Sequence, residues 1–175
     1  MQYSTQRHSI KEISQMTQAE FVQCFGSVFE ETPMVAQQAW LVRPFQDIAD
    51  LHEKMVTVVH NMTFTEKLVL IRAHPELGAR TQMADASVQE QASAGLDQLN
   101  TTDYHRIQAL NAAYKETFDF PFVVAVKGLT VEDIIAAMEV KLGAEREKEI
   151  TRSLSEIYKI ARFRLVDLVK ENAQL

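Results

Sequence analysis

The stretch TEKLVLIRAHPELG, residues 65–78, contains a strongly helix-forming run that ends at a proline. The residue before a proline is pushed out of the α region, so the helix is expected to end near Ala73, with His74 just beyond it. Glutamate, lysine, leucine and arginine, which occur in the run, have high helix propensity. The stretch therefore predicts a helix followed by a short break that starts at a histidine.

Helical spacing of apolar residues recurs along almost the whole chain. Two segments begin with a threonine followed three residues later by an acid, which is the spacing of a helix N-cap: Thr17 with Glu20, and Thr130 with Asp133. The dipeptide TP at residues 32–33 predicts another start, with threonine as N-cap and proline at the first helical position. The predicted helices cover about residues 17–29, 32–44, 51–59, 65–73, 87–99, 107–118, 130–143 and 145–171.

One segment departs from the helical pattern. DFPFVVAVKG, residues 119–128, has the continuous apolar character and the β-branched residues of a buried strand, but the sequence offers no second strand to pair with it. We therefore expect an extended segment that passes between helices. Its backbone N–H and C=O groups would then need other partners, which matters for a ligand site.

These patterns predict the fold class all-α, with a single-domain irregular bundle of about seven or eight helices. A chain of 175 residues is long enough to bury one sizeable core. The sequence contains no internal repeat, no low-complexity tract and no linker rich in proline, glycine or serine, so nothing in it indicates a second domain.

Composition and charge exclude several classes of function. The net charge is −6 and the basic residues are scattered among acids, so nucleic acid is not an expected partner. The apolar run FVVAV at residues 122–126 is too short to cross a membrane, and neither end resembles a targeting signal, so a cytoplasmic protein is expected. No two histidines have the helical spacing of a zinc site, and no glycine-rich phosphate loop is present, so we expect no metal and no cofactor.

Two polar residues in the middle of the chain could carry chemistry, although each has a structural interpretation as well. His74 could be an acid–base group, or it could bond the last carbonyls of its helix. Glu90 could close a capping box with Ser87. It could instead line a polar pocket together with Gln91 at a helix N-terminus, where backbone N–H groups favour anions.

Two arginines flank the apolar stripe of the last predicted helix, and periodicity does not choose between them. Arg162 and Arg164 lie about equally far from the centre of the stripe. Both could extend from its edge into water. Either could instead offer a guanidinium group to a carboxylate or a planar ureido group.

Six segments, taken in order, resemble the signature segments of the 2-oxo-4-hydroxy-4-carboxy-5-ureidoimidazoline (OHCU) decarboxylases. They are ETPMVAQQAW, RPF, IRAHPELG, SVQEQASAGL, LNAAYKETFDFPFVVAVKG and EIYKIARFRLVDLV. The ordered motifs HPxL, SxxEQxxAGL, FxFPF and KIxxxRL make the resemblance specific. It implies a single OHCU-decarboxylase-like helical domain over residues 1–175, with a core at about 17–170. One departure is Gly78, where alanine is common, and it should affect backbone freedom more than chemistry.

The resemblance also implies a function and a set of site residues. It implies a homodimeric enzyme without cofactor that converts OHCU to (S)-allantoin and carbon dioxide in urate breakdown. The catalytic residues implied by motif are His74 and Glu90, and KIxxxRL favours Arg164 over Arg162. The implied substrate-binding residues are Pro75, Ser87, Gln91, Arg164, and the backbone around Phe122 and Val124. Two alternatives remain open: an enzyme of the same fold that acts on a related ureido acid, and a non-catalytic helical interaction protein.

Overall fold

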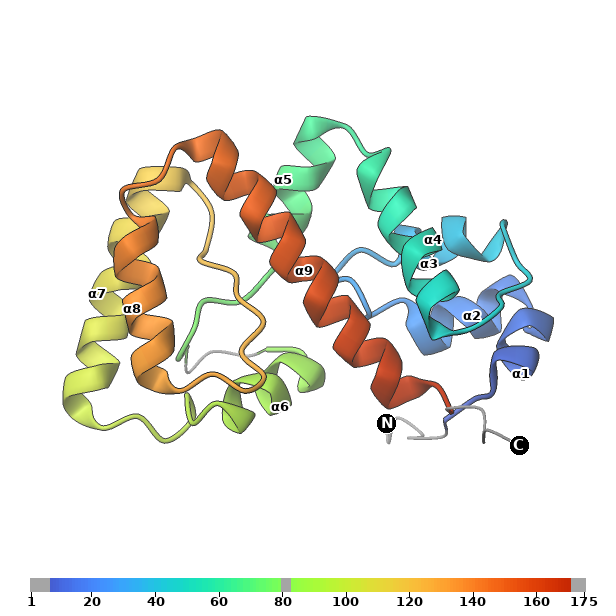
Figure 1. The fold of residues 1–175 in the computed structure, drawn as a ribbon, viewed down its shortest axis with the longest axis horizontal. Coiled ribbons are helices and arrows are strands. Elements are labelled where there is room, and N and C mark those ends of the chain that lie inside the picture. Colours follow the sequence, from blue (N-terminus) through green and yellow to red (C-terminus); the bar gives the residue numbers. More distant parts are fainter. Residues whose placement is uncertain (1–6, 80–82, 171–175) are drawn as a thin grey trace. The chain divides into compact units, whose positions relative to one another are not determined.

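Within residues 7–79 and 83–170, which the computed structural model describes, all regular secondary structure is helical (Figure 1). The helices are α1 (Ile10–Gln15), α2 (Gln18–Phe25), α3 (Met34–Trp40), α4 (Ile48–His60), α5 (Phe64–Arg72), α6 (Asp85–Ser93), α7 (Thr101–Phe118), α8 (Val131–Lys141) and α9 (Arg146–Leu168). The same residues contain one isolated β-bridge, between His8 and Val169. The nine helices of the described chain, of which only α1 is shorter than seven residues, confirm the all-α prediction.

The chain forms two compact units, which we describe separately. The terminal unit comprises Met1–Leu70 and Tyr158–Leu175, and the central unit comprises Ile71–Ile157. Helices α5 and α9 contribute residues to both units. The prediction of one domain over residues 1–175 stays a prediction, and residues 1–6, 80–82 and 171–175 of that range lie outside the described residues.

In the terminal unit, a side-chain cap fixes where α2 begins, as predicted. Thr17 and Glu20 form a reciprocal capping box, in which each side chain accepts from the backbone N–H of the other residue. The buried face of α2 contributes Phe21, whose ring centroid lies 4.8 Å from that of Phe25 and 5.5 Å from that of Phe45. Helix α3 packs against both α2 and α4, so these aromatic rings belong to the core of this unit.

The predicted start of α3 is wrong by one residue. Pro33 occupies the cap position rather than the first helical position, and the helix begins at Met34 without a side-chain cap. Thr32 does not act as an N-cap, because its hydroxyl donates to the carbonyl of Glu30 at 2.7 Å. The threonine therefore stabilises the turn before the helix, a use of the hydroxyl that competes with capping.

In the central unit, α7 and α8 lie side by side (Figure 1). The buried face of α7 carries Tyr114 and Phe118, whose ring centroids are 4.5 Å apart. Helix α8 begins with the predicted cap, since Thr130 and Asp133 form a reciprocal capping box. Local sequence signals therefore placed the start of this helix correctly.

The start and end of α6 differ from the prediction. The predicted capping box of Ser87 with Glu90 is wrong, because the cap position is Ala84, whose side chain has no acceptor. Ser87 consequently lies inside the first turn and is 3% exposed. The predicted continuation past Ser93 is wrong as well, since the helix ends there and Gly95 follows with a φ of 77°.

The segment after α7 is extended, as predicted. Residues 121–126 have no regular secondary structure, and all of them except Val124 are buried. The segment follows Asp119, which ends α7 in the left-handed conformation with a φ of 64°. Helix α9 spans Arg146–Leu168, close to the predicted 145–171, of which residue 171 lies outside the described part of the chain.

Candidate active site

His74 lies in the loop directly after α5, as the proline predicted. The helix ends at Arg72, and the backbone N–H of His74 donates to the Ile71 carbonyl at 3.2 Å. His74 is 7% exposed and Pro75 is half-buried. The imidazole is therefore withdrawn from open solvent, on a backbone that Pro75 restricts.

The side-chain amide of Gln91 bonds the loop that carries His74 to α6. Its Oε1 accepts from the backbone N–H of Gly78 at 2.9 Å, and its Nε2 donates to the Glu76 carbonyl at 3.2 Å. Nε2 also lies 3.5 Å from the sulfur of Met83. Because an amide both donates and accepts, this one side chain satisfies two backbone groups of the loop.

Asn111 supports the same loop from α7. Its Nδ2 donates to the Leu77 carbonyl at 2.8 Å, and the residue is buried. Its Oδ1 has no hydrogen-bond partner among the described residues. Sequence reasoning missed Asn111, although it lies between Ile107 and Tyr114 on the buried face of α7. A polar residue inside an apolar stripe needs a buried partner, and that requirement could have revealed it.

Gly78 has a backbone conformation that favours glycine. Its φ is 65°, and a Cβ atom added there would lie 3.0 Å from Cδ1 of Leu99. A side chain at this position would therefore meet both backbone strain and a close contact. Gly78 is thus suited to its position by its backbone conformation and by the lack of space for a side chain.

Three of the predicted site residues lie within five residues of α6. Ser87 and Gln91, four positions apart, are buried on the same face, and Glu90 is half-buried beside them. The bond from Gln91 to Gly78 joins this helix to the loop of His74. The structure thus brings the His74 segment and the Glu90 helix into direct contact.

The extended segment presents backbone groups, as its sequence suggested. The carbonyl of Val123 accepts a hydrogen bond from Arg152 of α9, and the N–H of Ala125 donates one to Glu156 of the same helix. The backbone groups of Phe122 and Val124 have no hydrogen-bond partner within residues 7–79 and 83–170. These are the positions from which contacts to a substrate were predicted.

Arg164 belongs to the terminal unit, whereas the other seven predicted site residues belong to the central unit. Its Nη1 lies 3.0 Å from Oε2 of Glu30 and 3.1 Å from the Ser27 carbonyl oxygen. Both side chains of this ion pair are 7% exposed. Arg162 is half-buried, and its Nη1 has no partner among the described residues.

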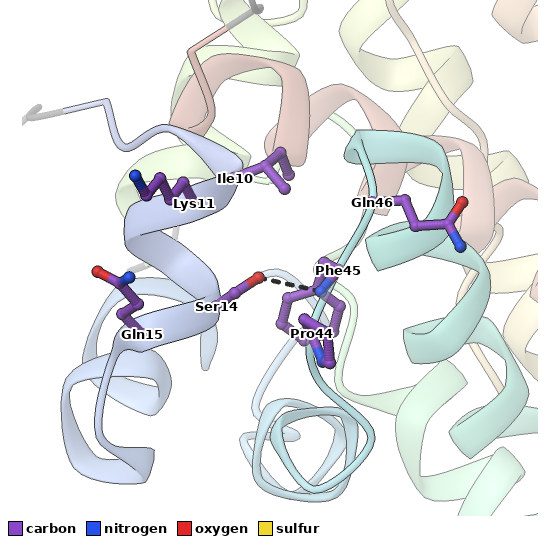
Figure 2. A pocket seen from close by; sticks show the side chains of 7 residues that line it. All are labelled: Ile10, Lys11, Ser14, Gln15, Pro44, Phe45 and Gln46. Carbon is purple, nitrogen blue, oxygen red and sulfur yellow. Dashed lines mark hydrogen bonds between the residues drawn. The ribbon is translucent and has the colours of Figure 1, made fainter.

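A pocket of about 500 Å³ lies in the terminal unit, between α1 and the chain that precedes α4 (Figure 2). Across it, the backbone N–H of Phe45 donates to Oγ of Ser14 at 3.0 Å. None of the predicted site residues lines it. Its lining residues are Ile10, Lys11, Ser14, Gln15, Pro44, Phe45 and Gln46.

The described residues provide neither a cluster of metal ligands nor a membrane span. No group of three or more His, Cys, Asp or Glu side chains there is arranged to hold a metal ion. None of the described helices is long and apolar enough to cross a membrane.

Comparison with known proteins identifies relatives over nearly the whole chain. The model of the OHCU decarboxylase family matches residues 14–166. The chain is 41% identical over 162 residues to a 2-oxo-4-hydroxy-4-carboxy-5-ureidoimidazoline decarboxylase of Halalkalicoccus jeotgali, an alignment that covers 93% of this chain and 92% of the relative. It is 40% identical over 166 residues to the uric acid degradation bifunctional protein PucL of Bacillus subtilis, with 95% of this chain covered. The chain spans only 34% of that longer protein.

Two solved structures share the fold. A crystal structure of (S)-allantoin synthase superimposes with a TM-score of 0.74 at 24% identity, covering 92% of this chain and 54% of that chain. A crystal structure of OHCU decarboxylase in the presence of (S)-allantoin gives a TM-score of 0.68 at 20% identity. The match covers 87% of this chain and 98% of that chain. At these identities the likeness concerns the fold alone.

Proposed function

The chain belongs to the OHCU decarboxylase family, and from this premise we propose how its residues convert OHCU to (S)-allantoin in urate degradation. The enzyme is a carboxy-lyase. One observation carries the proposed site: the 2.9 Å hydrogen bond from the Gly78 N–H to Gln91 links the loop of His74 to the helix of Glu90. Two groups capable of proton transfer therefore stand on segments that are bonded to each other.

The chemistry of OHCU requires orientation and proton management. Its carboxylate is attached to a carbon that also carries a hydroxyl group and stands beside a C=N bond. When the bond to the carboxylate breaks, carbon dioxide leaves and the electron pair moves into the C=N system. The neighbouring carbon must then take up a proton on one face to give one enantiomer. The substrate thus contains its own electron sink, and the protein supplies geometry and proton transfer.

His74 is proposed to hydrogen-bond the carboxylate or the hydroxyl group and to orient the breaking bond out of the ring plane. A buried imidazole suits this task, because its hydrogen bonds do not compete with bulk water. The short loop is fixed by Gln91 and Asn111, so the histidine is supported from two helices. Pro75 would restrict the backbone on the other side of the histidine.

Glu90 is proposed to take part in proton transfer near the ring, so that the new C–H bond forms on one face. Its half-buried position on α6 is compatible with contact to a substrate. Ser87 and Gln91 would line the same side of the site. Since the Gln91 amide already bonds the loop, its contribution to the substrate would be the second lone pair of Oε1.

Arg164 and the extended segment are proposed to bind the ring and ureido groups. A guanidinium group matches planar carbonyl and ureido acceptors. The backbone groups of Phe122 and Val124 would supply the remaining hydrogen bonds to the ring. Fixing the ring in this way selects the face that is protonated.

The activity is tested with OHCU generated freshly from urate by urate oxidase and hydroxyisourate hydrolase, while the optical activity of allantoin is recorded. We expect wild-type protein to form (S)-allantoin faster and with higher enantiomeric purity than buffer. Glu90→Gln should remain folded, but its rate of (S)-allantoin formation and the enantiomeric purity of its product should fall to those of buffer. Gln89→Glu, an exposed change on the same helix, should keep the rate and the purity of wild type. Equal rates and racemic product with wild-type protein and buffer would contradict the proposal.

A cytoplasmic location and a homodimer complete the proposal, with neither nucleic acid nor membrane as a partner. The family resemblance supports the dimer, and sedimentation equilibrium at micromolar concentration tests it. A monomeric mass that accompanies full activity would refute the dimer without affecting the catalytic assignment.

A further inference from the structure

Helix α9 carries a cluster of charged and polar side chains inside the central unit. Glu149 is 1% exposed and Ser153 is fully buried. Nε of Arg152 donates to Oε1 of Glu149, and the hydroxyl of Tyr114 donates to the same oxygen at 2.6 Å. Burial, with the hydrogen bond to Glu149 next, raises the pKa of Tyr114, so its hydroxyl remains a donor over the physiological pH range.

Arg152 joins this cluster to the extended segment. Its Nη1 donates to the Val123 carbonyl at 2.9 Å, and its guanidinium carbon lies 4.6 Å from the centroid of the Phe122 ring. One helical turn further on, Glu156 accepts from the Ala125 N–H at 2.9 Å. Helix α9 therefore holds the segment on both sides of Val124.

The side chains of Arg152 and Glu149 are 19% and 2% exposed, and an ion pair withdrawn from water to this degree adds little net stability to a core. Apolar residues of similar volume often give equal or greater stability, because the charges lose their hydration. An apolar side chain, however, cannot donate to the Val123 carbonyl. The planar fork of arginine reaches Glu149 and Val123 at once and also stacks on Phe122, which a lysine ammonium group cannot do.

We propose that Arg152 is a positioning residue that fixes the backbone of residues 122–124 for binding of the substrate ring. The inference rests on the proposed function, in which the backbone groups of Phe122 and Val124 contact that ring. Arg152 itself touches the segment and not the substrate. Arg152 therefore affects the affinity for the substrate ring. The chemical step depends on His74 and Glu90.

The test is Arg152→Lys, which keeps the charge beside Glu149 and removes the fork. Its matched control is Arg106→Lys, because Nε of Arg106 donates at 3.0 Å to Glu139 in an ion pair whose side chains are 54% and 44% exposed. The folded fraction is measured by circular dichroism and urea unfolding, and initial rates are measured over a range of OHCU concentrations. A purely structural role would lower kcat through loss of folded enzyme and leave KM unchanged.

We expect Arg152→Lys to raise KM roughly three- to tenfold, the equivalent of about one hydrogen bond, with kcat within about twofold of wild type. Arg106→Lys should change neither constant. A folded Arg152→Lys enzyme with wild-type KM would overturn the inference, whether or not kcat falls. If wild-type protein shows no OHCU decarboxylation, the proposed function fails first, and that result is distinct.

A second variant covers the case in which Arg152→Lys does not fold. The double change Glu149→Gln with Arg152→Gln removes both charges, so that no buried carboxylate is left at position 149 without its partner. It should fold and show the same rise in KM, because the shorter amide does not reach Val123 and Phe122 together. Unchanged KM in this variant, or failure of both variants to fold, would mean that the cluster serves stability alone.

Discussion

Replacing Gln91 by glutamate should loosen the loop that carries His74. The amide of Gln91 accepts from the Gly78 N–H at 2.9 Å and donates to the Glu76 carbonyl at 3.2 Å. A carboxylate of the same size keeps the first bond. It turns the second bond into a contact between two oxygen acceptors, inside a site where Gln91 is buried.

The expected cost follows from these two contacts. Losing the bond to Glu76 costs about 1 kcal/mol, and leaving a partly buried carbonyl and a carboxylate oxygen unpaired adds about 1–3 kcal/mol. We expect a loss of about 2–4 kcal/mol in the free energy of unfolding at pH 8, which a protein with a typical stability of about 5–15 kcal/mol survives. The same carboxylate at Gln89, which is exposed on the same helix, should cost less than about 0.5 kcal/mol.

The loss of unfolding free energy caused by Gln91→Glu should grow as pH rises. Burial raises the pKa of the new carboxyl group above the value of about 4.3 that it has in the unfolded chain. The folded form then binds more protons than the unfolded form between those two pKa values, so the cost grows as pH rises through this interval. The protonated group can also donate to the Glu76 carbonyl, as the amide does.

Urea unfolding of wild type, Gln91→Glu and Gln89→Glu at pH 8 and pH 5 measures these differences directly. We expect the deficit of Gln91→Glu to shrink by about 1 kcal/mol or more at pH 5. The kcat of Gln91→Glu should fall at pH 8, because the support of the His74 loop is lost. If both variants lose the same small amount at both pH values, the assignment of Gln91 to the loop is wrong.

Two further predictions concern the terminal unit. Glu30→Gln should lower the free energy of unfolding by about 3–5 kcal/mol, because it removes the buried carboxylate whose Oε2 lies 3.0 Å from Nη1 of the equally buried Arg164. Glu139→Gln in an exposed pair should cost at most about 1 kcal/mol. Equal losses in urea unfolding would refute this difference. Burial, and then the charge of Arg162, lower the pKa of His52 from its ordinary value of 6.5. His52 therefore contributes stability above about pH 6.5 that is lost as pH falls through its folded pKa, and His52→Gln should lose less stability between pH 7.5 and pH 5.5 than wild type does. Identical losses for the two proteins would show that His52 does not contribute.

The parts of the fold that local chemistry determines were predictable from the sequence. The capping boxes of Thr17 and Thr130 need only residues within the first helical turn, and both are present. The break at His74 follows from the steric effect of the next proline. The same spacing at Ser87 was misleading, because α6 begins earlier and the serine is used in the interior of the unit.

The residues that support the candidate site depend on contacts that local patterns do not contain. Glu149 and Arg152 are three residues apart and resemble an exposed helical ion pair, yet Glu149 is almost completely buried. Asn111 acquires its role only when the loop of His74 lies against α7. Sequence motifs therefore indicated which residues could act on the substrate, and the structure revealed which residues hold them.

The proposed role of the buried His74 in decarboxylation is measured by the rate at which His74→Ala forms (S)-allantoin. The variant is compared with wild type at equal folded enzyme and saturating, freshly generated OHCU. We expect kcat to fall by a factor of at least about 100, because a group that transfers or orients protons has been removed. A folded His74→Ala enzyme that keeps kcat within about threefold of wild type, a difference below about 0.7 kcal/mol, would contradict it.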